Sequence, residues 1–184
     1  MLEKLMELDG EILLWIQDNL RADFLNPLVK GITYLGNGGI LMIAVCLILM
    51  IIPKTRRLGA VCAFSLALEF IICNLLLKTT IARTRPYETV DGLTRIIGKQ
   101  SDYSFPSGHS GASFAVASVI FREAPKRIGI PILILAFLIA LSRLYVGVHF
   151  PTDVIAGIIL GTLTGIAACF AYHRITKSKE KIFS

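Results

Sequence analysis

The chain has 184 residues, of which 54% are apolar and only 17% are charged, and its mean hydropathy is +0.69. With the 15 glycines the apolar share reaches about 62%, against roughly 45–50% in a soluble domain. This composition excludes a disordered chain and favours a protein embedded in a membrane. The net charge of +6 is compatible with nucleic-acid binding, but no polar domain with clustered basic residues is present, so we expect no nucleic-acid partner.

The first 36 residues allow two interpretations. From Leu5 to Asp18 apolar residues recur at helical spacing among charged ones, which is typical of an amphipathic helix at a membrane surface. The stretch 24–35 is short, contains Lys30 and ends at a glycine-rich turn, 36–39. Either this region crosses the membrane once, or it lies along the outer interface; we favour a crossing. The first residues lack the basic flank and cleavage site of a secretory signal, so we expect no processing.

Five apolar runs then predict hydrophobic helices over residues 40–52, 58–77, 110–121, 128–141 and 154–172. Spanning a membrane takes about 20 residues, which only the second and fifth runs provide by themselves. We expect the shorter runs to use flanking residues or to lie beside recessed polar loops. The fold class predicted is therefore all-α: a multi-pass transmembrane bundle of five helices, or of six if the N-terminal region crosses.

Basic residues indicate the orientation of this bundle. Ten of the 19 lysines and arginines lie in two short loops and the tail: Lys54, Arg56, Arg57, Arg122, Lys126, Arg127, Arg174, Lys177, Lys179 and Lys181. Short cytoplasmic loops collect Lys and Arg, so these places belong on the cytoplasmic side and residues 79–103 and 147–152 face outward. We divide the chain into an N-terminal region (1–36), a membrane core (37–173) and a basic cytoplasmic tail (174–184).

The four cysteines lie inside apolar runs, with neither metal-ligand spacing nor loop positions suited to disulfides. We expect Cys46, Cys62, Cys73 and Cys169 to be small apolar helix residues.

Three polar clusters stand at the outward ends of the runs, and the first contains Lys78, Arg83 and Arg85. If the helix from residue 58 continues, Lys78 and Arg85 are seven residues apart and share a face, about 10 Å apart along the axis. Their long side chains then converge on one anion. The alternative is that both simply extend to the lipid headgroup region.

The second cluster spans residues 105–110 and leads into a helix of small residues. Backbone N–H groups at the start of a helix bind phosphate oxygens, and Ser107 and Gly108 stand at that start. His109 is placed to donate a proton to the group bonded to such an anion. The alternative is a capped helix start with a histidine at the interface.

The third cluster spans residues 142–153, with Arg143 at the end of one helix and Pro151 in the first turn of the next. His149 and Asp153 are four residues apart, so the carboxylate can accept a hydrogen bond from one imidazole nitrogen and leave the other unprotonated as a nucleophile. The alternative is a His–Asp capping pair.

Together the clusters combine three cations, an anion-binding helix start, a proton donor and an oriented imidazole. This combination predicts phosphoryl transfer. No pair of carboxylates and no Cys/His quartet nearby suits a metal ion, so we expect neither a metal nor another cofactor.

The order and spacing of these motifs resemble the three-part signature of the type-2 phosphatidate phosphatase superfamily, in its membrane lipid phosphatase branch. The matching positions run from Lys78 to Asp153 and leave the first 36 residues uncovered. The resemblance implies that His149 attacks phosphorus to form a phosphohistidine while Asp153 holds its ring. It implies that His109 protonates the leaving oxygen and later activates water. The residues implied to neutralise the phosphoryl oxygens are Lys78, Arg85, Ser107, Gly108 and Arg143.

Glu69 lies in the middle of an apolar run, where an ionised acid is costly. On a continuous α-helix it projects about 180° away from Lys78, nine residues later. We therefore expect a neutral or helix-paired acid without a catalytic role. Asn74 shares the face of Lys78 and either orients its ammonium group or bridges helices.

Two further sets of residues lie outside the signature. The glycines at 157, 161 and 165 predict close helix packing, within one chain or across a homodimer. Outer-loop residues either contact a second phosphate or a glycerol headgroup, or stay solvated: Arg83, Tyr87, Arg95, Lys99 and Tyr103.

The sequence thus predicts a lipid phosphatase or diphosphatase of a bacterial plasma membrane, with its active site at the outer face. Undecaprenyl diphosphate, phosphatidylglycerol phosphate and phosphatidate stay open as substrates, and the outer-loop cations slightly favour an isoprenoid diphosphate. A transporter or channel is the first alternative, but it requires ionisable residues along the membrane interior, where only Glu69 lies deep. The second is a vanadate-dependent haloperoxidase, whose family members are larger soluble proteins.

Overall fold

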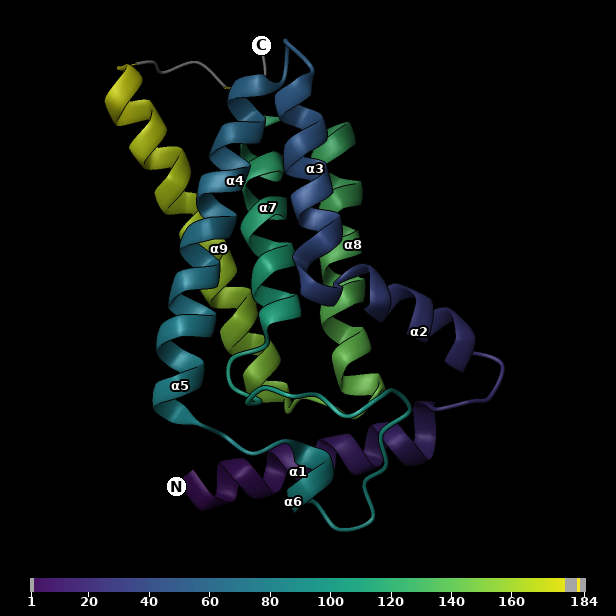
Figure 1. The fold of residues 1–184 in the computed structure, drawn as a ribbon. Helices are drawn as coiled ribbons and strands as arrows, with labels where there is room; N and C mark the ends of the chain where they lie inside the picture. The colour runs from purple at the N-terminus through teal and green to yellow at the C-terminus, as the bar shows by residue number, and fades with distance from the viewer. Residues whose placement is uncertain (1, 178–181, 183–184) are drawn as a thin grey trace.

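The protein is built from helices. Its computed structural model describes residues 2–177 and 182. Five helices run side by side along one axis (Figure 1): α3 (Ile40–Ile51), α4 (Arg56–Phe70), α7 (Gly108–Glu123), α8 (Lys126–Tyr145) and α9 (Pro151–Thr176). No strand occurs in the described residues. The predicted all-α bundle is confirmed.

The shorter helices connect or cap this bundle. Before it come α1 (Leu2–Leu20), α2 (Asn26–Leu35) and the 3₁₀ turn η1 (Asn37–Gly39). After α4 the chain continues through the π-helix η2 (Ile71–Leu77) and α5 (Lys78–Ile81) and, after a break, forms α6 (Pro86–Thr89). The tail residues Lys179 and Lys181 lie outside the described residues.

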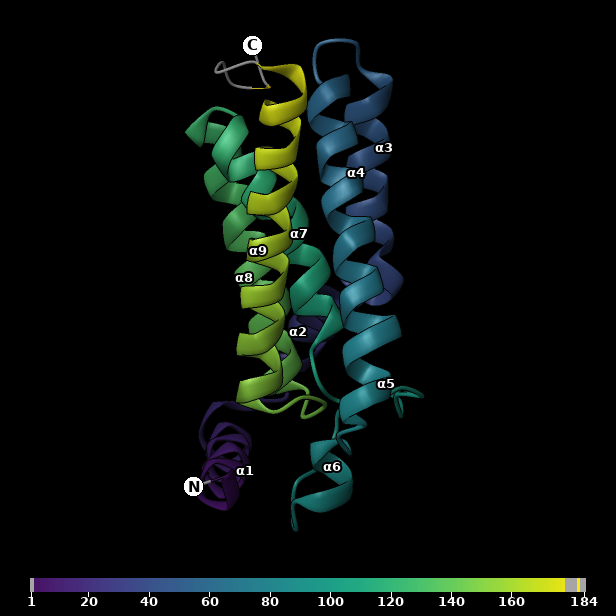
Figure 2. The same cartoon turned by 90° about the vertical axis from the view of Figure 1, so that its left-hand side faces the viewer.

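Helix α7 is the centre of the bundle, packed between the α8/α9 side and the α3/α4 side (Figure 2). Its small residues and three glycines on α9 allow the two backbones to approach closely. A Cβ at Gly161 would lie 2.2 Å from the carbonyl oxygen of Gly111, and one at Gly157 would lie 2.5 Å from that of Ser107. The glycine repeat is therefore used for packing within one chain.

The chain is a multi-pass membrane protein. In its described part, three helical stretches are long and apolar enough to cross a membrane: 56–89, Lys126–Tyr145 and Pro151–Thr176. Helices α2 and α3 pass the same test together, as one span bent by 44° at η1. Gly38 and Gly39 make this bend at φ +58° and +66°, a backbone conformation that glycine adopts without strain.

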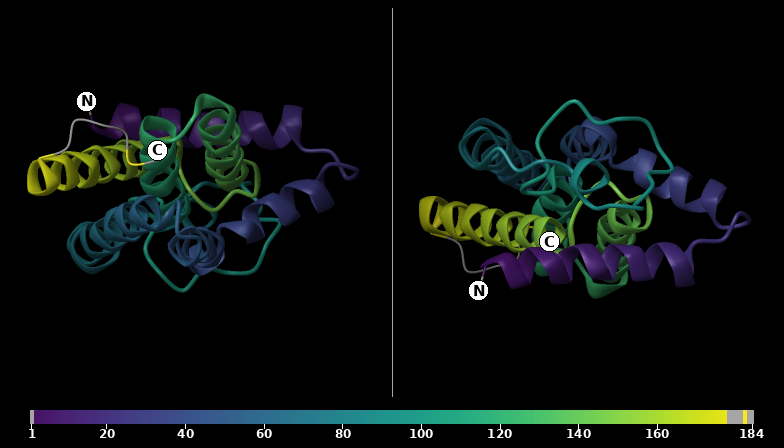
Figure 3. Two further views of the ribbon diagram at one scale, coloured as in Figure 1. Left: turned by 90° about the horizontal axis from the view of Figure 1, so that it is seen from above. Right: turned by 90° about the horizontal axis from the view of Figure 1, so that it is seen from below.

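Within the described residues, the N-terminal region has no candidate span of its own, because α2 passes the test only together with α3; this favours the interface alternative over our preference for a sixth crossing. Helix α1 lies across one end of the bundle instead of running along it (Figure 3). Its charged residues make it too polar for the bilayer core, and it lies outside the candidate spans.

Two expectations based on a continuous α-helix after residue 58 are also wrong. The helix ends at Ile81, because Ala82 takes a left-handed conformation (φ +49°), so Arg85 does not share a helix with Lys78. A π-helix has more residues per turn than an α-helix, so η2 rotates Lys78 toward the side of Glu69. Both residues therefore line the same cavity rather than opposite faces.

Candidate active site

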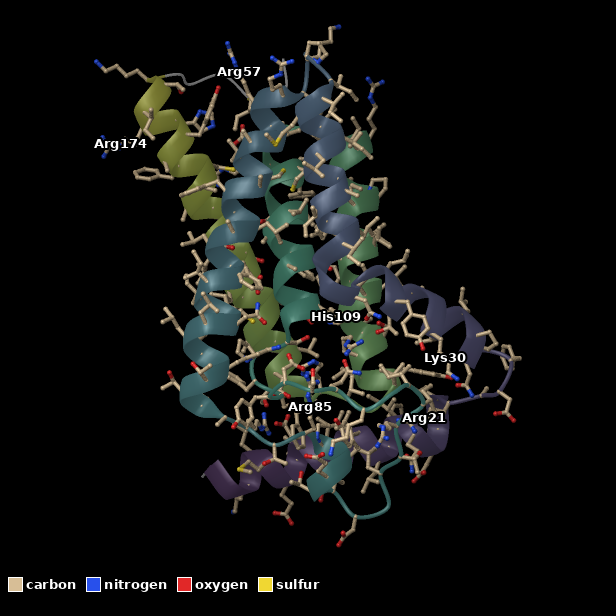
Figure 4. The ribbon with its side chains drawn as sticks, viewed as in Figure 1. Arg21, Lys30, Arg57, Arg85, His109 and Arg174 are labelled. Atoms are coloured by element: carbon tan, nitrogen blue, oxygen red, sulfur yellow. The ribbon has the colours of Figure 1, made fainter. Side chains whose placement is uncertain are left out.

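The three predicted clusters meet at one end of the bundle. Figure 4 shows Arg57 and Arg174 at the opposite end, and Arg85 and His109 close to the loops that join α5 to α7 and α8 to α9. The ends of different helices thus bring together residues that are up to 75 positions apart in the chain, from Lys78 to Asp153.

His149 is only 1% exposed, and its imidazole lies against Arg85. Its Nε2 is 2.9 Å from Nη1 of Arg85. A guanidinium only donates, so Nε2 is the acceptor and the ring proton is on Nδ1. Burial, followed by the positive charges of Arg85 and Arg143, lowers the pKa of His149 well below its usual range. His149 is therefore neutral, with an unprotonated Nε2.

Asp153 lies beside His149 but is held mainly by other groups. Its Oδ2 is 3.6 Å from Nδ1 of His149, longer than a hydrogen bond, and that Nδ1 has no partner among the described residues. Arg83 donates to Oδ1 at 2.6 Å, while the Ser104 hydroxyl and the Phe150 N–H donate to Oδ2 at 2.5 and 2.9 Å. The carboxylate is thus fixed next to the ring by residues that the sequence analysis did not assign to it.

Arg83 was expected to contact a lipid headgroup or to stay solvated, but it binds two carboxylates. Besides Asp153 it binds Asp9 of α1 at 2.8 Å, and its guanidinium lies 3.9 Å above the ring of Phe150. Asp9 also accepts hydrogen bonds from the backbone and the hydroxyl of Thr152. Arg83 therefore ties α1 to the start of α9, next to His149, and does not extend toward a headgroup.

Lys78 and Arg85 converge on one anion, and that anion is the carboxylate of Asp102. Both cations are buried, and both form ion pairs with Asp102, the Arg85 pair at 2.6 Å. Burial raises the pKa of Asp102, but the hydrogen bonds and charges of Lys78 and Arg85 outweigh it and lower that pKa to about 2. Asp102 could not be identified from the sequence, because no motif contains it.

Arg143 is completely buried at the same place. Its guanidinium donates to Thr33 of α2 at 2.6 Å and to the side-chain oxygen of Gln100 at 3.3 Å. Its Nε has no partner in the part of the chain that the structure describes. A buried N–H without an acceptor is costly, so this site has a donor available for an anion.

The start of α7 completes the site. Ser107 is the N-cap of α7. We expected its N–H to bind phosphate, but this N–H already donates to the carbonyl of Asp153 at 3.0 Å. A Cβ at Gly108 would lie 3.6 Å from Nζ of Lys78, which shows how closely this helix start approaches the cations. The ring of His109 contacts Asn37, with Nε2 2.9 Å from Oδ1.

An apolar cavity of about 610 Å³ opens from the polar site into the membrane region. Its polar end contains Lys78, Asp102 and His109, and its walls come from α3 and α4, with Leu47 and Leu66 among them. Glu69 also lines it, with Oε1 buried and unpaired among the described residues.

The remaining candidates of the outer loop have partners within that loop or are exposed. Lys99 pairs with Glu88 at 2.7 Å, and the guanidinium of Arg95 lies 5.0 Å from the ring of Tyr87. Tyr103 is exposed, and the amide of Asn74 donates to the carbonyl of Phe70 in its own helix. The structure does not bring the outer-loop residues into the cluster around His149, whereas Asn74 lines the same cavity as Lys78.

Comparison with known proteins assigns this arrangement to a family. The sequence profile of the PAP2 superfamily matches residues 58–177. The chain belongs to the PAP2 superfamily. An undecaprenyl-diphosphatase from Sulfolobus acidocaldarius is 37% identical over 120 residues, which cover 65% of this chain and 58% of that protein. The chain thus spans less than two thirds of the length of that relative.

Solved structures agree with this assignment. A transmembrane PAP2-type phosphatidylglycerolphosphate phosphatase from Bacillus subtilis superposes with a TM-score of 0.77 at 28% identity, covering 94% of this chain and 88% of that one. LpxE from Aquifex aeolicus superposes with a TM-score of 0.74 at 29% identity, covering 87% and 93%. The resemblance drawn from the three motifs is confirmed, and membership of the family supports the predicted enzyme class of membrane lipid phosphatases.

Proposed function

We propose that this PAP2 protein hydrolyses a phosphate monoester or diphosphate of a membrane lipid through a phosphohistidine on His149, without a metal ion. One observation carries the proposal: the unprotonated Nε2 of His149 lies 2.9 Å from Arg85, the charges of Arg143 and Lys78 act on the same ring, and Lys78 also lines the polar end of an apolar cavity. Such a site binds the phosphate in the polar part and the lipid chain in the apolar part.

In the first step the phosphoryl group replaces Asp102 as the partner of Lys78 and Arg85. Arg85 then turns from Nε2 of His149 to a phosphoryl oxygen, which frees the Nε2 lone pair. A bond forms between Nε2 and phosphorus, and the bond between phosphorus and the leaving oxygen of the lipid breaks. The fixed Asp153 carboxylate stabilises the positive charge that develops on the ring.

His109 moves the protons. The negative charge of the bound phosphate offsets the neighbouring cations and favours the imidazolium form of His109. That form protonates the leaving oxygen, so that the lipid alcohol or lipid monophosphate departs. The neutral ring then takes a proton from water, which attacks the phosphohistidine and releases inorganic phosphate. Lys78, Arg85 and Arg143 stabilise the charge on the phosphoryl oxygens in both steps, and removing such a donor typically lowers kcat about 10²–10³-fold.

The cavity supports a lipid substrate. Its apolar walls, lined by side chains such as Ile43 and Phe70, suit a hydrocarbon chain better than water or a soluble metabolite. Relatives are named for undecaprenyl diphosphate and phosphatidylglycerol phosphate, so a prenyl diphosphate and a phosphatidylglycerol phosphate or phosphatidate are the candidate substrates. The basic loops at the opposite end support an active site at the outer face of the membrane.

The test is phosphate release by the purified protein in detergent micelles containing farnesyl diphosphate, phosphatidylglycerol phosphate or phosphatidate. We expect release from at least one lipid, with EDTA present, and none from His149→Ala. His173→Ala is the control, because His173 lies at the opposite end of the bundle and contacts Glu123. Failure to hydrolyse any of the three lipids, or full activity of His149→Ala, contradicts the proposal.

A further inference from the structure

The acid-base histidine is contacted by a segment that lies outside the part of the chain matched by the family profile. Asn37, in η1 between α2 and α3, places Oδ1 2.9 Å from Nε2 of His109. The neighbouring Gly36 approaches the same ring so closely that a Cβ there would lie 2.6 Å from Cδ2 of His109. The hinge of the bent span therefore packs directly on the histidine.

The chemistry of His109 decides which atom of the amide faces it. To act as an acid, the imidazolium carries a proton on both nitrogens, so the group facing Nε2 has to be an acceptor. The Oδ1 atom of Asn37 meets this requirement, and the Nδ2 group does not. With Nε2–H bound to Oδ1 in both charge states, Nδ1 is the nitrogen that gains and loses the proton.

We propose that Asn37 is a positioning residue that fixes the orientation and tautomer of His109, so that Nδ1 exchanges protons with the leaving oxygen and with water. This inference rests on the proposed phosphatase function and adds a residue to it. A second residue of the same region, Thr33, binds Arg143 at 2.6 Å. The α2–η1 segment thus supports one proton-transfer residue and one cation of the site.

Changing the charge of residue 37 distinguishes a positioning role of Asn37 from a role in packing alone. Asn37 is neutral, and the hinge 36–39 contains no ionisable residue. The ionisable groups around His109 come from other elements: Glu69, Lys78, Arg85, Asp102, Arg143 and His149. An aspartate at position 37 adds a negative charge beside Nε2, which stabilises the imidazolium. An alanine removes the acceptor without adding a charge.

The experiment compares Asn37→Ala and Asn37→Asp with the wild type in micelles of the lipid that the wild type hydrolyses best. Asn37→Ala is expected to lower kcat about tenfold or more, part of the 10²–10⁴-fold that general acid-base catalysis supplies. KM is expected to change little, because Asn37 contacts none of the three cations. In Asn37→Asp the basic limb of the pH profile of kcat/KM is expected to move up by about one unit, while the acidic limb, set by His149, stays in place.

The controls separate this inference from the function on which it rests. Asn19→Ala removes another exposed amide, which donates to the carbonyl of Trp15, and is expected to match the wild type. A kcat of Asn37→Ala within twofold of the wild type, or an unmoved basic limb in Asn37→Asp, overturns the positioning role. If the wild type itself releases no phosphate from any lipid, the proposed function fails instead. Thermal melting in detergent shows whether the alanine variant folds; where it does not, the pH profile of Asn37→Asp decides.

Discussion

Asp102 occupies the place that the proposed mechanism assigns to a phosphoryl oxygen, so its removal should strengthen the binding of phosphate. In Asp102→Asn the ion pairs to Lys78 and Arg85 are lost, and the substrate no longer has to displace them. The side chain of Asp102 is 48% exposed. Each ion pair should therefore contribute a free energy near the upper end for exposed pairs, about 0.5–1 kcal/mol. Two pairs give about 1–2 kcal/mol, which corresponds to about 5–30-fold in affinity.

The assay is inhibition of lipid hydrolysis by inorganic phosphate. We expect the inhibition constant of Asp102→Asn to fall about 5–30-fold, with a similar fall in KM. Because the pKa of Asp102 is about 2, the carboxylate stays ionised down to acidic pH, and the difference should persist across the assay range. Asp91→Asn, on the exposed part of the same loop, is the control. An unchanged or higher inhibition constant in Asp102→Asn would refute the reasoning, since Asp102 would then assist anion binding.

Three further predictions concern pH, the tether of α1 and helix packing. Since the pKa of His149 is lowered, and protonation removes its nucleophilic lone pair, kcat/KM should fall with decreasing pH only well below about 6.5; an acidic limb at or above that value contradicts the assignment. Asp9→Asn leaves Arg83 with one carboxylate fewer and should lower the free energy of unfolding by about 1–3 kcal/mol, measured by melting in detergent; an unchanged melting temperature argues against the tether. Gly161→Ala should destabilise by about 2 kcal/mol or more, because its Cβ meets backbone, whereas Gly31→Ala has open space and should be neutral or stabilising; equal melting temperatures would contradict this packing.

Much of the fold and of the site could be predicted because the relevant signals are local. Long apolar runs and basic loops define the helices and their ends, and the motifs at those ends identify His109, His149 and the three cations. The order of helices alone then places these ends together, since alternating spans return every second loop to the same side.

The contacts that complete the site depend on tertiary structure and could not be predicted from local patterns. Asp102, Thr33 and Asn37 lie outside the three polar clusters, and only the folded chain brings them to the cations and to His109. The geometry after residue 58 was mispredicted for a related reason. A π-helix and a left-handed Ala82 change the helical phase, and neither has a clear signature in the sequence.

The central claim is that His149 carries the phosphoryl group during turnover. The most direct measurement is rapid quenching of the enzyme with a lipid substrate labelled in its phosphate, using His109→Ala to slow hydrolysis of the intermediate. We expect the label on His149 within the first turnover, stable to alkali and lost in acid, and no label on His149→Ala. The claim is contradicted if both the wild type and His109→Ala turn over without any labelled protein. It is also contradicted if the label persists in His149→Ala.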